Sequence, residues 1–135
     1  MTSLHDQPSS SVFNPRIFLS QDRTGRSTGN YQKNEKIFVQ GEPAGTVCYI
    51  RKGRVKVTVL SDLGKEAVIG FPARGRFFGE GCLDGAELRI STAHAVEECP
   101  VTSIVKATTI ATLDAEPKFS AFFVAFLLSQ LQRKN

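Results

Sequence analysis

The chain has 135 residues, of which 41% are hydrophobic, and a formal net charge of +4 at pH 7. This length fits one domain of about 100–150 residues with one hydrophobic core. No apolar run approaches the roughly 20 residues of a membrane-spanning helix. The N-terminus lacks the basic-then-apolar pattern of a signal peptide, so we expect a cytoplasmic protein.

Residues 1–29 are predicted to form a leader in front of the folded core. Residues 1–12 are polar and rich in Ser, with too few apolar side chains to fold, which indicates a flexible segment. Pro15 suits the first turn of a helix, so we predict a short helix near residues 14–20 that packs on the rest of the domain. Residues 21–30 are rich in Gly, Ser, Thr and Arg, which predicts a loop.

Residues 30–106 alternate short apolar runs with glycine-containing turns. Within residues 55–60 apolar and polar side chains alternate, which is the pattern of a half-buried strand. Seven or so short strands at this spacing are typical of a β-sandwich or jelly roll. The other strands are predicted at residues 36–40, 47–50, 66–71, 93–98 and 101–106.

Residues 107–135 change to the apolar spacing of a helix. A short amphipathic element is predicted at residues 108–115, and a longer helix begins at Pro117. The apolar stripe of this helix is wider than one sheet face would cover. Two interpretations stay open: the helix packs only on the β-core, or part of it forms a dimer interface. The residues assigned to that interface are Phe122, Phe123, Phe126, Leu127 and Leu131.

Residues 78–92 carry the groups that an anionic, sugar-bearing ligand needs. Gly79 and Gly81 let the backbone approach closely and turn its N–H groups toward a phosphate. Glu80 can accept a hydrogen bond from a sugar hydroxyl, and Arg89 supplies a planar fork that matches phosphate oxygens. The alternative is that Glu80 and Arg89 only pair with each other across a turn.

This segment and the order of motifs from Asn30 to Lys134 resemble the effector domain of Crp/Fnr-type transcriptional regulators, which binds cyclic nucleotides. The matching motifs lie at residues 36–42, 47–57, 64–66 and 78–92. The resemblance implies a mainly β fold, a jelly roll with a short N-terminal helix and C-terminal helices. It also implies the ligand-binding residues Gly79, Glu80, Gly81, Cys82, Leu83, Arg89, Ile90, Ser91, Val57, Ile69 and Phe71.

The resemblance gives these residues separate roles. Glu80 would face the ribose hydroxyl and Arg89 the cyclic phosphate, with backbone N–H groups around the phosphate. Val57 and Ile69 would be apolar walls, although both would also face the core of any jelly roll. Ile90 stands where the family usually has a hydroxyl, which removes one charged hydrogen bond worth about 1.5–3 kcal/mol.

Other chemistries find little support in the sequence. The three cysteines are widely spaced, which predicts neither disulfides nor a metal site, and they serve best as small apolar residues. The alternative for Cys82 is a redox switch with a pKa lowered by Arg89. Metal-dependent jelly-roll enzymes need a His-x-His pair, whereas this chain has only His5 and His94. We therefore expect no catalytic residue, no metal, no cofactor and no enzymatic activity.

Two functions stay open. The first is a regulatory domain that senses cyclic AMP, cyclic GMP or a related anion and relays binding through the last helix. The second is a pairing module with a vestigial pocket, which forms a homodimer or joins a full-length regulator. A helix-turn-helix domain needs on the order of 60 further residues after this helix, and the sequence ends at Asn135, so we expect the effector domain of such a regulator without its helix-turn-helix domain. Because the basic residues are dispersed, we expect no direct DNA binding by this chain.

Overall fold

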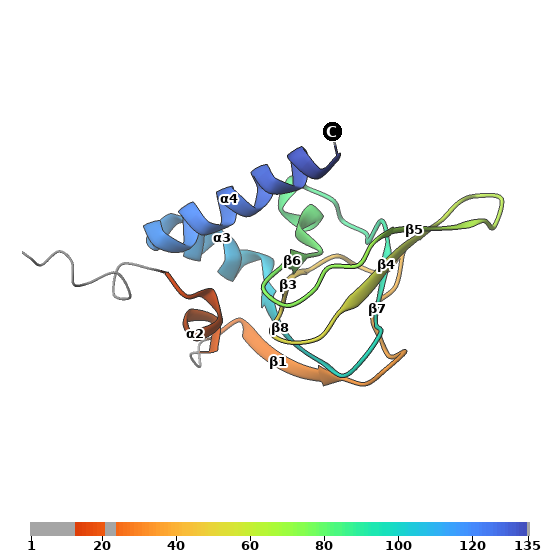
Figure 1. Cartoon of the computed structure of the whole chain (residues 1–135). Coiled ribbons are helices and arrows are strands. Elements are labelled where there is room, and N and C mark those ends of the chain that lie inside the picture. Colours follow the sequence, from red (N-terminus) through yellow and green to blue (C-terminus); the bar gives the residue numbers. More distant parts are fainter. Residues whose placement is uncertain (1–12, 21–23, 135) are drawn as a thin grey trace, which may run out of the picture.

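The computed structural model describes residues 13–20 and 24–134, and it shows a β-roll with helices gathered on one side (Figure 1). Two four-stranded antiparallel sheets form the roll. The first has the order β1 (Arg26–Tyr31), β8 (Cys99–Val105), β3 (Thr46–Ile50) and β6 (Phe77–Phe78). The second has the order β2 (Lys36–Phe38), β7 (Thr92–Ala95), β4 (Val55–Leu60) and β5 (Glu66–Gly70). The predicted jelly roll with flanking helices is confirmed.

Strand β3 is buried on both of its faces and therefore separates two hydrophobic clusters. Cys48 and Ile50 point into the cluster between the two sheets. Val47 and Tyr49, which alternate with them, point into a second cluster beneath the helices. This follows from the two-residue period of a strand, which sends neighbouring side chains to opposite faces. A strand covered on both sides becomes a continuous apolar run, as the sequence has it.

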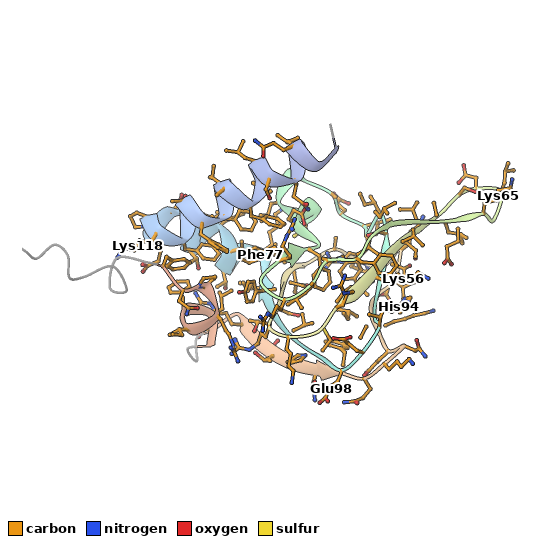
Figure 2. All side chains as sticks on the ribbon, in the orientation of Figure 1. Lys56, Lys65, Phe77, His94, Glu98 and Lys118 are labelled. Atoms are coloured by element: carbon orange, nitrogen blue, oxygen red, sulfur yellow. The ribbon has the colours of Figure 1, made fainter. Side chains whose placement is uncertain are left out.

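Phe77 lies at the centre of the cluster beneath the helices (Figure 2). Its ring is fully buried, and its centroid lies 4.9 Å from that of Phe123 and 5.5 Å from that of Phe126. Both partners come from helix α4 (Pro117–Lys134). Aromatic pairs at these separations add to the stability that burial provides. The ring contacts therefore fasten α4 to the β-roll.

The predicted dimer interface is corrected by this packing. Phe123 and Phe126 are buried within the chain, and the partly buried Phe122 packs on the same cluster. Phe123 and Phe126 are therefore core residues, because their rings pack on Phe77 and on each other, and Phe122 packs on the rings of Phe13 and Phe77. Leu127 and Leu131 lie on the exposed side of α4 and are 37% and 60% exposed. Of the five residues assigned to the interface, only these two are exposed, and Val124 and Leu128 of α4 are exposed as well.

The helices begin close to the predicted positions. Helix α2 (Pro15–Ser20) has Asn14 before its first turn, where the Oδ1 atom of Asn14 accepts a hydrogen bond from the Ile17 N–H at 3.2 Å. Helix α3 (Lys106–Ala115) follows β8 directly, two residues earlier than predicted. None of the helices in the described ranges is long and apolar enough to cross a membrane. The predicted flexible segment, residues 1–12, lies outside the described residues.

Two strands were not predicted. The loop prediction for residues 26–30 is wrong, because these residues form β1 and pair with β8 in continuous antiparallel register. The two-residue strand β6 pairs with β3, with Cys48 opposite Phe78. In both cases the partner strand is distant in the sequence, so local composition carries no sign of the pairing.

Candidate functional site

A cleft of about 430 Å³ lies between the second sheet, residues 79–91 and the C-terminal half of α4. Ten of the eleven residues predicted from the sequence as ligand-binding line it. Leu83 is the exception and corrects that prediction, because its side chain packs against the cluster beneath the helices instead. The other lining residues are Phe38, Ala44, Gly70, Pro72, Arg76, Phe77, Phe78, Ala86, Leu88 and Gln130.

Gly79 makes the turn that leads into the phosphate-binding segment. Its φ of 76° lies in the left-handed region, which glycine adopts without steric cost. A Cβ atom at this position would lie 2.7 Å from Nη1 of Arg89 and 3.2 Å from Cε2 of Phe38. The 3-10 helix η1 (Glu80–Asp84) follows and ends at Gly85, whose φ is 89°. Glycine is therefore required at position 79 for both conformation and space, and at position 85 for conformation.

Arg89 is a buried cation at the base of the cleft and is only 7% exposed. Its Nη1 donates to the Gly79 carbonyl at 3.1 Å. Its Nη2 donates to the carbonyl and the hydroxyl of Thr46, both at 2.9 Å. The guanidinium also lies 4.0 Å from the centroid of the Phe38 ring. The buried Nε atom has no hydrogen-bond partner, so the guanidinium retains donor capacity.

Backbone hydrogen bonds hold Arg89 in register with the loop after β2. The Arg89 N–H donates to the Glu42 carbonyl at 2.7 Å, and the Gly41 N–H donates to the Arg89 carbonyl at 2.8 Å. These two bonds fix the backbone of Arg89 next to the antiparallel bridge between Pro43 and Leu88. The cation is therefore positioned from both its backbone and its side chain.

Glu80 does not pair with Arg89, which removes the alternative that the two residues only bind each other. Glu80 is partly buried, begins η1 and lines the cleft. Within the part of the chain that the structure describes, its carboxylate makes no hydrogen bond or ion pair. Two opposite charges thus line one cleft, each with capacity for a ligand.

The mouth of the cleft is apolar. Ile69 is 59% exposed, so the alternative that it is a core residue is wrong, and its neighbours in β5 from Glu66 to Val68 are exposed as well. Val57 is half-buried and packs against the cluster between the sheets. Ile90 is 72% exposed at the same rim. Its side chain supplies no hydrogen bond, as expected, and the partly buried Ser91 beside it also lines the cleft.

The redox hypothesis for Cys82 is wrong. The thiol is fully buried and donates weakly to the Thr46 carbonyl at 3.6 Å. Burial raises the pKa of Cys82, and the opposing effect of the nearby Arg89 is smaller. Burial likewise raises the pKa of Cys48 and brings that of Cys99 to about 11. At neutral pH all three side chains stay protonated, as space-filling thiols.

Two features of the site were missed from the sequence. Thr46 supplies two of the three acceptors for the Arg89 guanidinium. Gln130 on α4 lines the cleft and accepts a hydrogen bond from Arg76 at 3.0 Å. Neither residue carries a local signal, since a Thr at a strand start and a Gln on a helix are common. Across the described ranges, no cluster of three or more His, Cys, Asp or Glu side chains could hold a metal ion.

This arrangement matches a known domain. The model of the family described as "Cyclic nucleotide-binding domain" matches residues 28–115, which include the whole cleft segment around Arg89. The chain belongs to the cyclic nucleotide-binding domain family. It is 30% identical over 106 residues to a cAMP-activated global transcriptional regulator CRP from Haemophilus influenzae, covering 78% of this chain and 47% of that protein.

Solved structures agree on the fold of this cyclic nucleotide-binding domain. The c-di-GMP responsive global regulator CLP of Xanthomonas campestris superposes with a TM-score of 0.76 at 22% identity, over 88% of this chain and 58% of that one. The catabolite activator protein of Thermus thermophilus gives a TM-score of 0.75 at 21% identity, over 92% and 57%. The chain spans about half the length of the curated relatives that it matches. Domains of this family serve regulators and are typically non-enzymatic.

Proposed function

We propose that this domain senses a cyclic nucleotide, which binds in the cleft with its phosphate at Arg89 and a ribose hydroxyl at Glu80, and that it relays binding through α4. The domain is itself non-catalytic. The observation that carries the proposal is the set of groups around the buried Arg89 guanidinium. This buried cation has only neutral hydrogen-bond partners and keeps one donor, Nε, without a partner.

Burial of an unpaired charge is costly, and an anion that binds beside it removes part of that cost. A phosphate would therefore gain from Arg89 more than a neutral ligand would. The backbone of Gly79 and η1 adds N–H groups at the same end of the cleft. These groups offset the hydroxyl that Ile90 does not supply.

The relay to α4 has a physical basis in shared contacts. Phe77 and Phe78 line the cleft, and Phe77 also lies at the centre of the ring cluster that holds α4. Gln130 on α4 lines the cleft directly. A ligand that fills the cleft therefore contacts both the helix and the ring that positions it. The exposed leucines of α4 would carry the signal to a second copy of the chain.

Thermal unfolding of the full chain with cyclic AMP, cyclic GMP and AMP tests the proposal. A ligand that binds only the folded state raises stability by RT ln(1 + [L]/Kd), about 2.7 kcal/mol at a hundredfold excess over Kd. We expect a cyclic nucleotide to raise the unfolding temperature and AMP to have little effect. Glu80→Gln should reduce this shift, because the amide is a weaker acceptor than a carboxylate.

Glu87→Gln is the matched control, since Glu87 is exposed in the same segment and does not line the cleft. This variant should respond to the nucleotide as the unmodified chain does. A folded protein that shows no shift with either cyclic nucleotide would refute the proposed function.

A further inference from the structure

The α4 side of the cleft holds a polar pair outside the phosphate-binding segment. Nη2 of Arg76 donates to Oε1 of Gln130 at 3.0 Å, and both residues line the cleft. The Arg76 guanidinium also lies 5.4 Å from the centroid of the Phe126 ring on the same helix. The pair thus joins the segment before β6 to α4. Its position is set by a hydrogen bond and a cation–π contact together.

The chemistry of the two side chains fixes which groups they can offer. A guanidinium carries only donors, so the amide oxygen of Gln130, and not its nitrogen, must face Arg76. The amide nitrogen Nε2 carries two further donors, and it makes no hydrogen bond to another described residue. With Oε1 engaged by Arg76, Gln130 offers the cleft the two donors of Nε2 and not its acceptor.

The remaining lining defines where a base would lie. Among the described residues around the cleft, the other charged or hydroxyl side chains are Glu80, Arg89 and Ser91, all within the phosphate-binding segment. Val57 of β4 and Ile69 of β5 supply apolar walls of the same cleft. A nucleotide with its phosphate at Arg89 therefore has only Arg76 and Gln130 to read the polar edge of its base.

We propose that Arg76 and Gln130 select a cyclic purine nucleotide whose base presents acceptors, and thus guanine over adenine. This inference rests on the proposed function. Guanine presents acceptors at O6 and N7, which suit an arginine or another donor, whereas adenine presents an amino donor at N6 beside the N7 acceptor. An adenine amino group beside Gln130 would meet the Nε2 donors, while the Oε1 acceptor is already engaged by Arg76. A base whose hydrogen-bonding groups are matched in this way binds more tightly than a mismatched base by about 1–3 kcal/mol, or roughly 5- to 150-fold in Kd.

Calorimetric titration of the full chain with cyclic GMP, cyclic IMP and cyclic AMP tests the inference. Hypoxanthine keeps the O6 and N7 acceptors of guanine but lacks its 2-amino group. We expect cyclic GMP and cyclic IMP to bind with similar Kd, and cyclic AMP to bind at least about fivefold more weakly. Equal or tighter binding of cyclic AMP would overturn the base preference while leaving the proposed function intact. If none of the three binds to the folded chain, both the preference and the proposed function are overturned.

The variant Gln130→Glu should reverse the base preference, because it replaces the amide donors by carboxylate acceptors. The carboxylate still pairs with Arg76 but presents only acceptors, so the ratio of Kd values should shift toward cyclic AMP by about tenfold or more. Gln132→Glu places the same charge on an exposed position of α4 that does not line the cleft, and it should leave the ratio unchanged. An unchanged ratio in Gln130→Glu, with unfolding as in the unmodified chain, would also overturn the assignment.

Discussion

Substitution of Gly79 by alanine should damage both the stability of the domain and its cleft. Alanine in the left-handed region costs about 1–2 kcal/mol by steric strain. The new Cβ would also lie 2.7 Å from Nη1 of Arg89, so the guanidinium must leave the Gly79 carbonyl. Loss of a hydrogen bond to a charged group adds about 1.5–3 kcal/mol. We therefore expect the free energy of unfolding to fall by about 2.5–5 kcal/mol in Gly79→Ala.

Urea unfolding followed by circular dichroism measures this loss, and Gly81→Ala is its matched control. Gly81 has no positive φ, and a Cβ atom there would meet nothing within 4 Å. The control should change the free energy of unfolding by no more than about 0.5–1 kcal/mol. If the two alanine variants unfold at the same urea concentration with the same slope, the close contact between Gly79 and Arg89 does not have the role described.

Three further predictions concern the core, the thiols and α4. Phe77→Ala should cost about 3–5 kcal/mol in urea unfolding, whereas Phe71→Ala at the half-exposed cleft wall should cost far less; equal losses would contradict the central role of Phe77. The Cys99 pKa is raised from 9.0 to about 11 in the folded state. The protonated thiol therefore contributes fully to the free energy of unfolding below about pH 9, and this contribution is lost as the pH rises toward 11. At pH 8 all three thiols should label slowly in the native chain and rapidly in urea, and fast native labelling would refute their burial. Leu131→Lys should lower the mass of the protein in solution, measured by sedimentation, because the charge would separate two copies paired through α4. The control Leu63→Lys, on the β4–β5 turn, should leave the mass unchanged. A mass unaffected by Leu131→Lys excludes pairing through that residue.

The parts that the sequence predicted well are those set by neighbours along the chain. Gly79, before Glu80, needs a backbone conformation that favours glycine, and the strand and helix periods are local patterns, so both could be predicted directly. The pairing of β1 with β8 joins residues more than 65 positions apart. This polar segment, which includes Ser27 and Gly29, forms a strand because β8 offers it backbone hydrogen-bond partners, and the local sequence does not reveal this pairing.

Packing direction was harder to predict than element type. The apolar period of α4 indicates a helix with a wide stripe, but it does not say which part of the stripe the same chain covers. Phe126 was assigned to a dimer interface because nothing in its surroundings along the sequence points to Phe77. The same limit applies to Gln130, whose place in the cleft depends on the angle at which α4 crosses the roll. Tertiary contacts decide both cases.

Arg89 combines two roles that a simple deletion cannot separate. Its guanidinium holds the carbonyls of Gly79 and Thr46, so removing it leaves buried acceptors without donors, at a cost of about 1–3 kcal/mol for each such group. A variant without Arg89 would therefore lose stability whether or not the residue binds a ligand. Glu80 lines the same cleft without a hydrogen bond to any other described residue, so its substitution leaves these contacts in place. Ligand response is thus better attributed through Glu80, and stability through Gly79, than either is through Arg89 itself.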